Sequence, residues 1–97
     1  MSKPAKTTLV DPAWSMVSGR QTIGGVLFIA YRTGILRYTN VSEDGKIRLH
    51  SSARQNHTSV EVLGHGFVLS PRTGKPHRFQ DRRKAALAGI AKRDELS

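Results

Sequence analysis

The stretch TIGGVLFIAYRTGILRYTNVSEDGKIRLHS, residues 22–51, decides the fold that this sequence predicts. The turn-forming runs RTG (32–34) and SEDG (42–45) divide it into the strand-like segments TIGGVLFIAY, ILRYTNV and KIRLHS. Two similar segments follow, SVEVL at 59–63 and GFVLS at 66–70. We therefore expect an antiparallel meander of four or five strands. The run 26–31 is apolar at every position, so we expect a central strand that is covered on both faces.

The SEDG turn sets the expected register of the hairpin around it. A four-residue loop would pair residue 41 with 46, 39 with 48 and 37 with 50. One face of this hairpin is then mostly apolar, and Tyr38 points inward with it. The other face is basic and carries Arg37, Lys46, Arg48 and His50.

The C-terminal segment predicts a helix from about residue 81 to residue 93, with Asp81 as its N-cap. A stripe of larger apolar residues is expected to cover the sheet; it consists of Ala86, Leu87, Ile90 and Ala91, extended by Phe79. The small residues Ala85, Ala88 and Gly89 fall on the opposite side, where they would suit a homodimer. The expected class is thus α+β, with one C-terminal helix packed on a face of the sheet.

The chain of 97 residues is long enough for one modest core. Residues 1–12 are polar apart from a few positions and contain two prolines, so we expect a flexible tail there. A single small domain at 13–97 would follow it.

The positive charge of the chain is concentrated near its C-terminus. The formal net charge is +9, and the segment 71–93 supplies +7, because eight Lys and Arg residues stand there against the single acid Asp81. Such an excess repels itself in a folded protein and is typical of a surface that binds a polyanion, most often nucleic acid.

Arg82, Arg83 and Lys84 fall in the first turn of the predicted helix, where exposed N–H groups already make the chain positive. Each cation there is unfavourable by about 0.3–1 kcal/mol at low salt. A phosphate bound at this end would reverse the sign of that interaction. A solvated charged face that tolerates the penalty is the alternative interpretation.

A basic turn precedes the helix, in the string PRTGKP at 71–76. Proline and glycine predict a turn that protrudes at a sheet edge. The string resembles the tip of the DNA-bending arm in the HU and IHF nucleoid proteins. The resemblance covers six residues and does not extend to that family's two N-terminal helices or its long arm. It implies a basic loop that is able to enter a groove of DNA.

The sequence predicts a non-catalytic protein that binds nucleic acid, DNA more readily than RNA, as a small regulator or a nucleoid or replication accessory factor. Contacts to phosphates are expected from Arg72, Lys75, Arg78, Arg82, Arg83 and Lys84, with Arg37, Lys46 and Arg48 in support. The alternative is a protein-interaction module or inhibitor that docks its basic C-terminal region on an acidic partner protein.

The sequence gives less support to enzymes, metal-binding proteins and membrane proteins. The chain has no cysteine, and its four histidines, at positions 50, 57, 65 and 77, follow no metal-ligand or catalytic spacing. We therefore expect no enzyme, no metal and no cofactor. The longest apolar run is far shorter than the ~20 residues that span a bilayer, and no signal peptide is recognisable. A cytoplasmic location without a membrane partner is expected, associated with the nucleoid if the source is bacterial.

Overall fold

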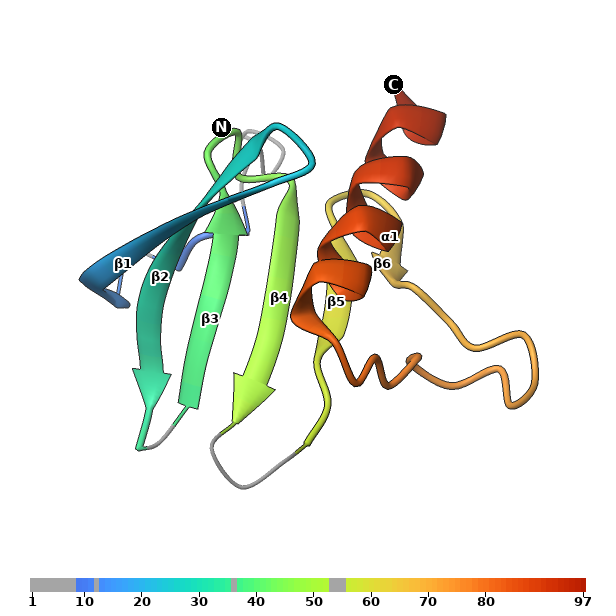
Figure 1. Cartoon of the computed structure of the whole chain (residues 1–97), viewed down its shortest axis with the longest axis horizontal. Coiled ribbons are helices and arrows are strands. Elements are labelled where there is room, and N and C mark those ends of the chain that lie inside the picture. The colour runs from blue at the N-terminus through green and yellow to red at the C-terminus, as the bar shows by residue number, and fades with distance from the viewer. Residues whose placement is uncertain (1–8, 12, 36, 53–55) are drawn as a thin grey trace, which may run out of the picture.

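The computed structural model describes residues 9–11, 13–35, 37–52 and 56–97. They form an antiparallel sheet with one helix on a face (Figure 1), which confirms the predicted class and the meander. The strands follow one another in sequence order. They are β1 (Ser15–Ile23), β2 (Val26–Gly34), β3 (Arg37–Ser42), β4 (Ile47–Ser52), β5 (Ser59–Val62) and β6 (Gly66–Phe67), and the helix is α1 (Arg82–Leu96).

The sheet gains its sixth strand at a two-residue turn that the sequence analysis placed inside a strand. Gly24 and Gly25 have φ of 57° and 80°, and Ile23 pairs with Val26 across them. Positive φ at both central residues is the requirement of the tight turn that best matches strand twist. β1 and β2 are therefore a hairpin. β2 pairs with a strand on each side, which confirms a central strand at 26–31. The expected cover on both faces is incomplete, because only Phe28 of this run is fully buried.

The register of the β3–β4 hairpin is shifted by two residues from the prediction. Val41 pairs with Arg48, and residues 43–46 connect the end of β3 to the start of β4. The reason is the hydrogen bonding of Ser42, whose hydroxyl accepts from the Ile47 N–H at 2.9 Å and donates to the Asp44 carboxylate at 2.5 Å. Because the shift is an even number, every side chain keeps its predicted face.

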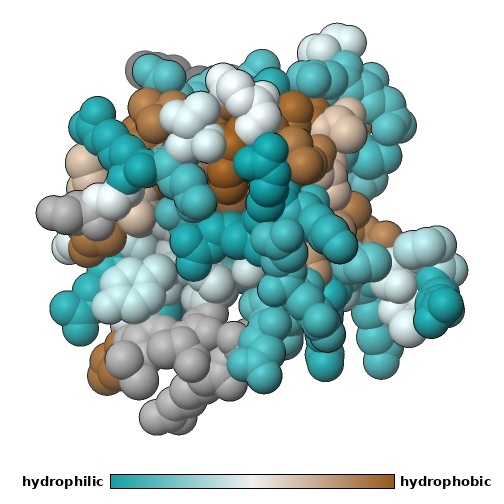
Figure 2. All heavy atoms as spheres, in the orientation of Figure 1, coloured by the Kyte–Doolittle hydropathy of each residue, from teal (hydrophilic) through white to brown (hydrophobic). Residues whose placement is uncertain are grey.

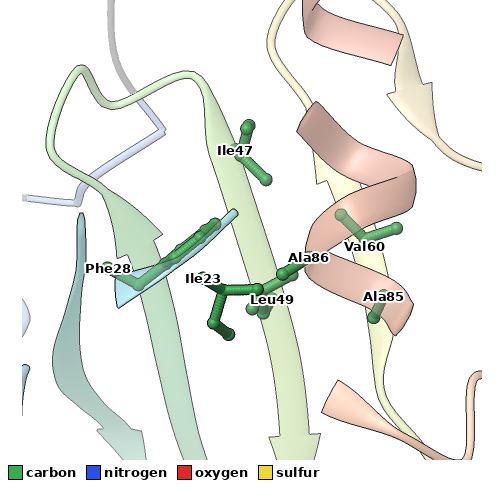
Figure 3. Close-up of a cluster of buried hydrophobic side chains, with 7 residues drawn as sticks. All are labelled: Ile23, Phe28, Ile47, Leu49, Val60, Ala85 and Ala86. Atoms are coloured by element: carbon green, nitrogen blue, oxygen red, sulfur yellow. The ribbon is translucent and has the colours of Figure 1, made fainter. Parts of the chain in front are cut away.

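The helix packs on the sheet through its small residues. Ala85, Ala86 and Gly89 are buried against β4 and β5, where they meet Ile47, Leu49 and Val60 (Figure 3). Asp81 is the N-cap, as predicted, and its carboxylate accepts from the Arg83 N–H at 2.9 Å.

The predicted face of the helix is wrong for Leu87 and Ala91, which are exposed, and for Ala85 and Gly89, which lie inside. The Leu87 side chain instead lies beside Gly24, at the β1–β2 turn. Two of the three residues predicted for a homodimer surface, Ala85 and Gly89, are therefore covered by the chain's own sheet, and Ala88 is half-buried.

The second face of the sheet is crossed by the segment before β1. Leu9 is buried at 4% exposure, and its N–H donates to the Gly45 carbonyl at 2.8 Å. Trp14 lies against Tyr31 of β2, with ring centroids 6.1 Å apart. Of the tail expected at 1–12, residues 1–8 and 12 lie outside the described residues, while Leu9 is packed on the sheet.

Candidate nucleic-acid interface

The first turn of α1 presents three exposed cations and no acid. Arg82, Arg83 and Lys84 follow the N-cap Asp81, whose single carboxylate is engaged with the Arg83 N–H. The helix end and the side chains thus carry charge of the same sign at one place. This is the arrangement that a bound phosphate relieves.

The basic turn at 71–76 protrudes from the edge of the sheet beyond β6, as predicted (Figure 1). Its neck is closed by hydrogen bonds from the Ser70 N–H to the Lys75 carbonyl at 2.8 Å and from the His77 N–H to the Val68 carbonyl at 2.9 Å. Arg72 and Lys75 are exposed at its tip, and Gly74 adopts φ of 69°. The turn is therefore a short hairpin whose base is closed by backbone hydrogen bonds.

Four carboxylates of the described residues neutralise cations elsewhere in the molecule. Lys92 pairs with Glu95, Arg93 with Asp44 and Asp94, and Arg48 with Glu61. No ion pair forms, among the residues that the structure describes, at the cations around the helix start and the hairpin, namely Arg72, Lys75, Arg78, Arg82, Arg83 and Lys84. We call these six residues the basic end.

Arg48, predicted as a supporting phosphate contact, is held inside the fold. Its guanidinium pairs with Glu61, donates to the Leu9 carbonyl at 3.1 Å and lies 5.3 Å from the centroid of the Trp14 ring. Its side chain is only 17% exposed. These contacts tie the N-terminal segment to the sheet, so the position of Arg48 favours a structural role.

The two other supporting residues are Arg37 and Lys46, and both are exposed. Lys46 lies in the turn between β3 and β4, whereas Arg37 lies on the face of the sheet that α1 does not cover. Arg37 borders a small hollow there with Trp14 and His50. Arg82, Arg83 and Lys84 therefore lie at the start of α1, and Arg72 and Lys75 lie on the hairpin that projects beyond β6 (Figure 1), with Arg78 in the segment between them. Arg37 and Arg48 belong to the other face of the sheet, and Lys46 to the turn between β3 and β4.

A groove opens on the helix-facing side of the sheet, beyond the start of α1. Its volume is about 1190 Å³. The floor consists of parts of β2, β3 and β4, with β1 on one side and Gln80, Arg82 and the residues before β5 on the other. Figure 2 shows apolar side chains gathered in the upper part of this face, near the β1–β2 turn, and hydrophilic ones below.

Three cations line this groove, and none of its described lining residues is acidic. Arg82 belongs to the predicted site, whereas Arg20 and Arg32 come from β1 and β2 and were missed. The alternation of Arg32 with Ala30 and Phe28 indicates that the three side chains share a face of the sheet. The sequence does not indicate how much of that face α1 covers. Tyr38, expected to point inward, lies on this floor with 41% exposure because α1 does not reach it.

Titratable groups cluster on the opposite face, around Glu61. Burial lowers the pKa of His50, with help from the Arg48 charge and against the hydrogen bond of Glu61. Burial alone would raise the pKa of Glu61, but hydrogen bonds from Arg48 and His50 bring it below its usual value. The free energy of unfolding, rather than the charge of the groove, should therefore depend on the protonation of this cluster.

We expect the free energy of unfolding to fall as pH drops below 6.5, the ordinary pKa of histidine. The unfolded chain takes up a proton at His50 there, while the folded chain resists it. A second loss is expected below 4.5, where the unfolded chain protonates Glu61 before the folded one does. Urea unfolding at about pH 7.5 and about pH 5.5 measures the first step.

The variant His50→Gln keeps a hydrogen-bonding side chain and removes the titration. It should be less sensitive to acid over that interval than the parent protein. Equal losses of stability in the two proteins would assign the step to another group.

No three His, Asp or Glu side chains of the described residues lie close enough together to hold a metal ion. In the same part of the chain, no helix is both long and apolar enough to cross a membrane. Comparison of the chain with protein-family models, with curated proteins and with solved structures found no match. Its function must therefore be argued from its own geometry.

Proposed function

We propose that this protein binds nucleic acid without catalysing a reaction, through phosphate contacts made by the basic end. One observation carries the proposal: Arg72, Lys75, Arg78, Arg82, Arg83 and Lys84 form no ion pair with the described carboxylates, while Arg48, Lys92 and Arg93 each do. Unpaired cations at a helix N-terminus and on a protruding hairpin fit the spaced phosphates of a nucleic-acid backbone. DNA is the favoured partner, and such a domain would serve as a small regulator or a nucleoid or replication accessory factor.

The hairpin and the start of α1 would make different kinds of contact with the nucleic acid. Arg72 and Lys75 stand at the tip of a braced turn, so they can reach into a groove of a duplex. Arg83 and Lys84 belong to the first helical turn, where the Asp81 carboxylate already accepts from the Arg83 N–H. A phosphate there would gain the charge of both side chains together with hydrogen bonds from the other N–H groups of the turn. Arg37, on the other face, and Lys46, in the β3–β4 turn, would add a weaker and less directed attraction.

Salt dependence tests this proposal directly. If about six phosphates are engaged, the logarithm of the affinity should fall by about 5 per unit of the logarithm of salt concentration. Fluorescence anisotropy with labelled random duplex, single-stranded DNA and RNA, between about 50 and 200 mM salt, measures this slope. A slope near zero would refute the proposal.

An acidic protein is the rival partner, and its binding would also weaken with salt. The choice of ligand separates the two functions. Absence of binding to duplex, to single-stranded DNA and to RNA at the lowest salt would favour the protein partner.

A further inference from the structure

The groove beside the helix start has features that phosphate binding alone does not use. Arg32, Tyr38 and Ser51 form a row across its floor, because Arg32 pairs with Tyr38 and Tyr38 with Ser51 in the β2–β3 and β3–β4 registers. The Tyr38 ring is 41% exposed in this row. An aromatic side chain left open beside an arginine offers a flat surface on which a planar group can stack.

The charges of the groove select an anionic ligand. Arg32 and Arg82 line it from β2 and α1, Arg20 borders it on the edge strand β1, where it pairs with Ile29, and no described lining residue is an acid. None of these three arginines forms an ion pair with a described carboxylate. A ligand that carries several negative charges would therefore meet cations on both sides of the floor.

The remaining lining includes four side-chain amides, which are able to both donate and accept hydrogen bonds. Gln21, Asn40, Asn56 and Gln80 bring amide groups from β1, β3, the segment before β5 and the segment before α1. Side-chain amides form paired hydrogen bonds with the edges of nucleobases. The groove volume of about 1190 Å³ exceeds the ~300–1,000 Å³ typical of small-molecule pockets, so it has room for more than one nucleotide.

We propose that this groove binds an unpaired stretch of nucleic acid, with one base stacked on Tyr38 and the flanking phosphates held by Arg32 and Arg82, while Arg20 adds positive charge at the edge strand. The inference rests on the proposed function and names the form of nucleic acid that this part of the surface takes. A duplex keeps its bases stacked on each other, so it leaves the Tyr38 ring without a partner, whereas a single strand can turn a base out onto it.

The test compares three variants on the same probes: labelled oligo-dT and oligo-U of about ten nucleotides and a duplex of similar length. Tyr38→Leu removes the stacking surface and should lower the affinity for both single strands about tenfold. Affinity for the duplex should stay unchanged, because the basic end is intact. Tyr38→Phe keeps the ring and should bind like the parent protein.

Phe67→Leu is the matched control, since Phe67 is an exposed aromatic residue on the opposite face, paired with Glu61 and next to His50. It should leave all affinities unchanged. Oligo-dT and oligo-U carry the same phosphates and differ in sugar and methyl group, so their relative affinity identifies DNA or RNA as the natural source.

Failure of this inference is distinct from failure of the proposed function. If the parent protein binds none of the probes, the proposed function fails, and the groove proposal fails with it. If it binds them but Tyr38→Leu leaves single-strand affinity unchanged, or weakens the duplex equally, only the groove proposal is overturned. Competition by poly-glutamate as strong as that by oligo-dT would also overturn it.

Discussion

Replacing Arg83 and Lys84 by alanine should lower the affinity for nucleic acid roughly 10- to 100-fold near 0.1 M salt. Both side chains are exposed on the first turn of α1 and form no ion pair with a described carboxylate, so each can contact a phosphate. The logarithmic salt slope should become shallower by about 2, one unit for each phosphate contact that is lost. Anisotropy titrations over a series of salt concentrations measure both quantities.

The same variant should not lose stability. Alanine is the best helix former, and the removal of cations from the positive helix end is favourable by about 0.3–1 kcal/mol for each. Weaker binding together with an unchanged or higher unfolding temperature would show that these residues serve a ligand. A fall in unfolding temperature would instead assign them to the fold.

The matched control lies at the other end of the same helix. Lys92→Ala with Arg93→Ala removes the same charge, but these cations pair with Glu95, Asp44 and Asp94. This double variant should keep nearly the parent affinity and slope. Equal losses in the two double variants would mean that only net charge matters and that the basic end is not a site.

Local sequence patterns were sufficient to predict the meander and the helix. Turn residues mark the strand ends, and Asp81 marks the start of α1. The Gly24–Gly25 turn was missed because the apolar run around it continues without interruption. Its signal was present, since two adjacent glycines supply the two positive φ angles that the turn requires.

The candidate site could be predicted only where it is continuous in the chain. Six cations within residues 72–84 form the basic end, and their crowding is visible in the sequence. The groove joins Arg20, Arg32 and Arg82, which are brought together because α1 covers only part of the sheet. How far a helix extends over a sheet depends on packing, and no periodicity in the sequence encodes it.

The side of the helix that meets the sheet was mistaken for a related reason. Periodicity assigns large apolar residues to the core, but close approach to β-branched residues on a sheet requires small ones. Ala85, Ala86 and Gly89 permit that approach, and Leu87 is left to cover the β1–β2 turn. The identity of Gly89 thus reports the distance between α1 and the sheet.

Gly89→Ala should therefore destabilise the protein, although alanine favours helices by about 1 kcal/mol over glycine. A Cβ atom at position 89 would lie 2.7 Å from Cγ2 of Val60 and 2.8 Å from Cγ2 of Ile47. These β-branched side chains are fully buried and stiff, so the helix must shift away from β4 and β5. Overpacking of this kind costs about 1–3 kcal/mol, and urea unfolding should show a net loss in that range.

Ala91→Gly provides the comparison, because residue 91 is exposed on the same helix. There the change should cost about 1 kcal/mol through helix propensity alone. The two substitutions are opposite in direction, yet both should destabilise the protein if contact with the sheet outweighs propensity at position 89. If Gly89→Ala raised the free energy of unfolding, α1 would have to lie farther from Ile47 and Val60, and the groove beside its first turn would have a different shape.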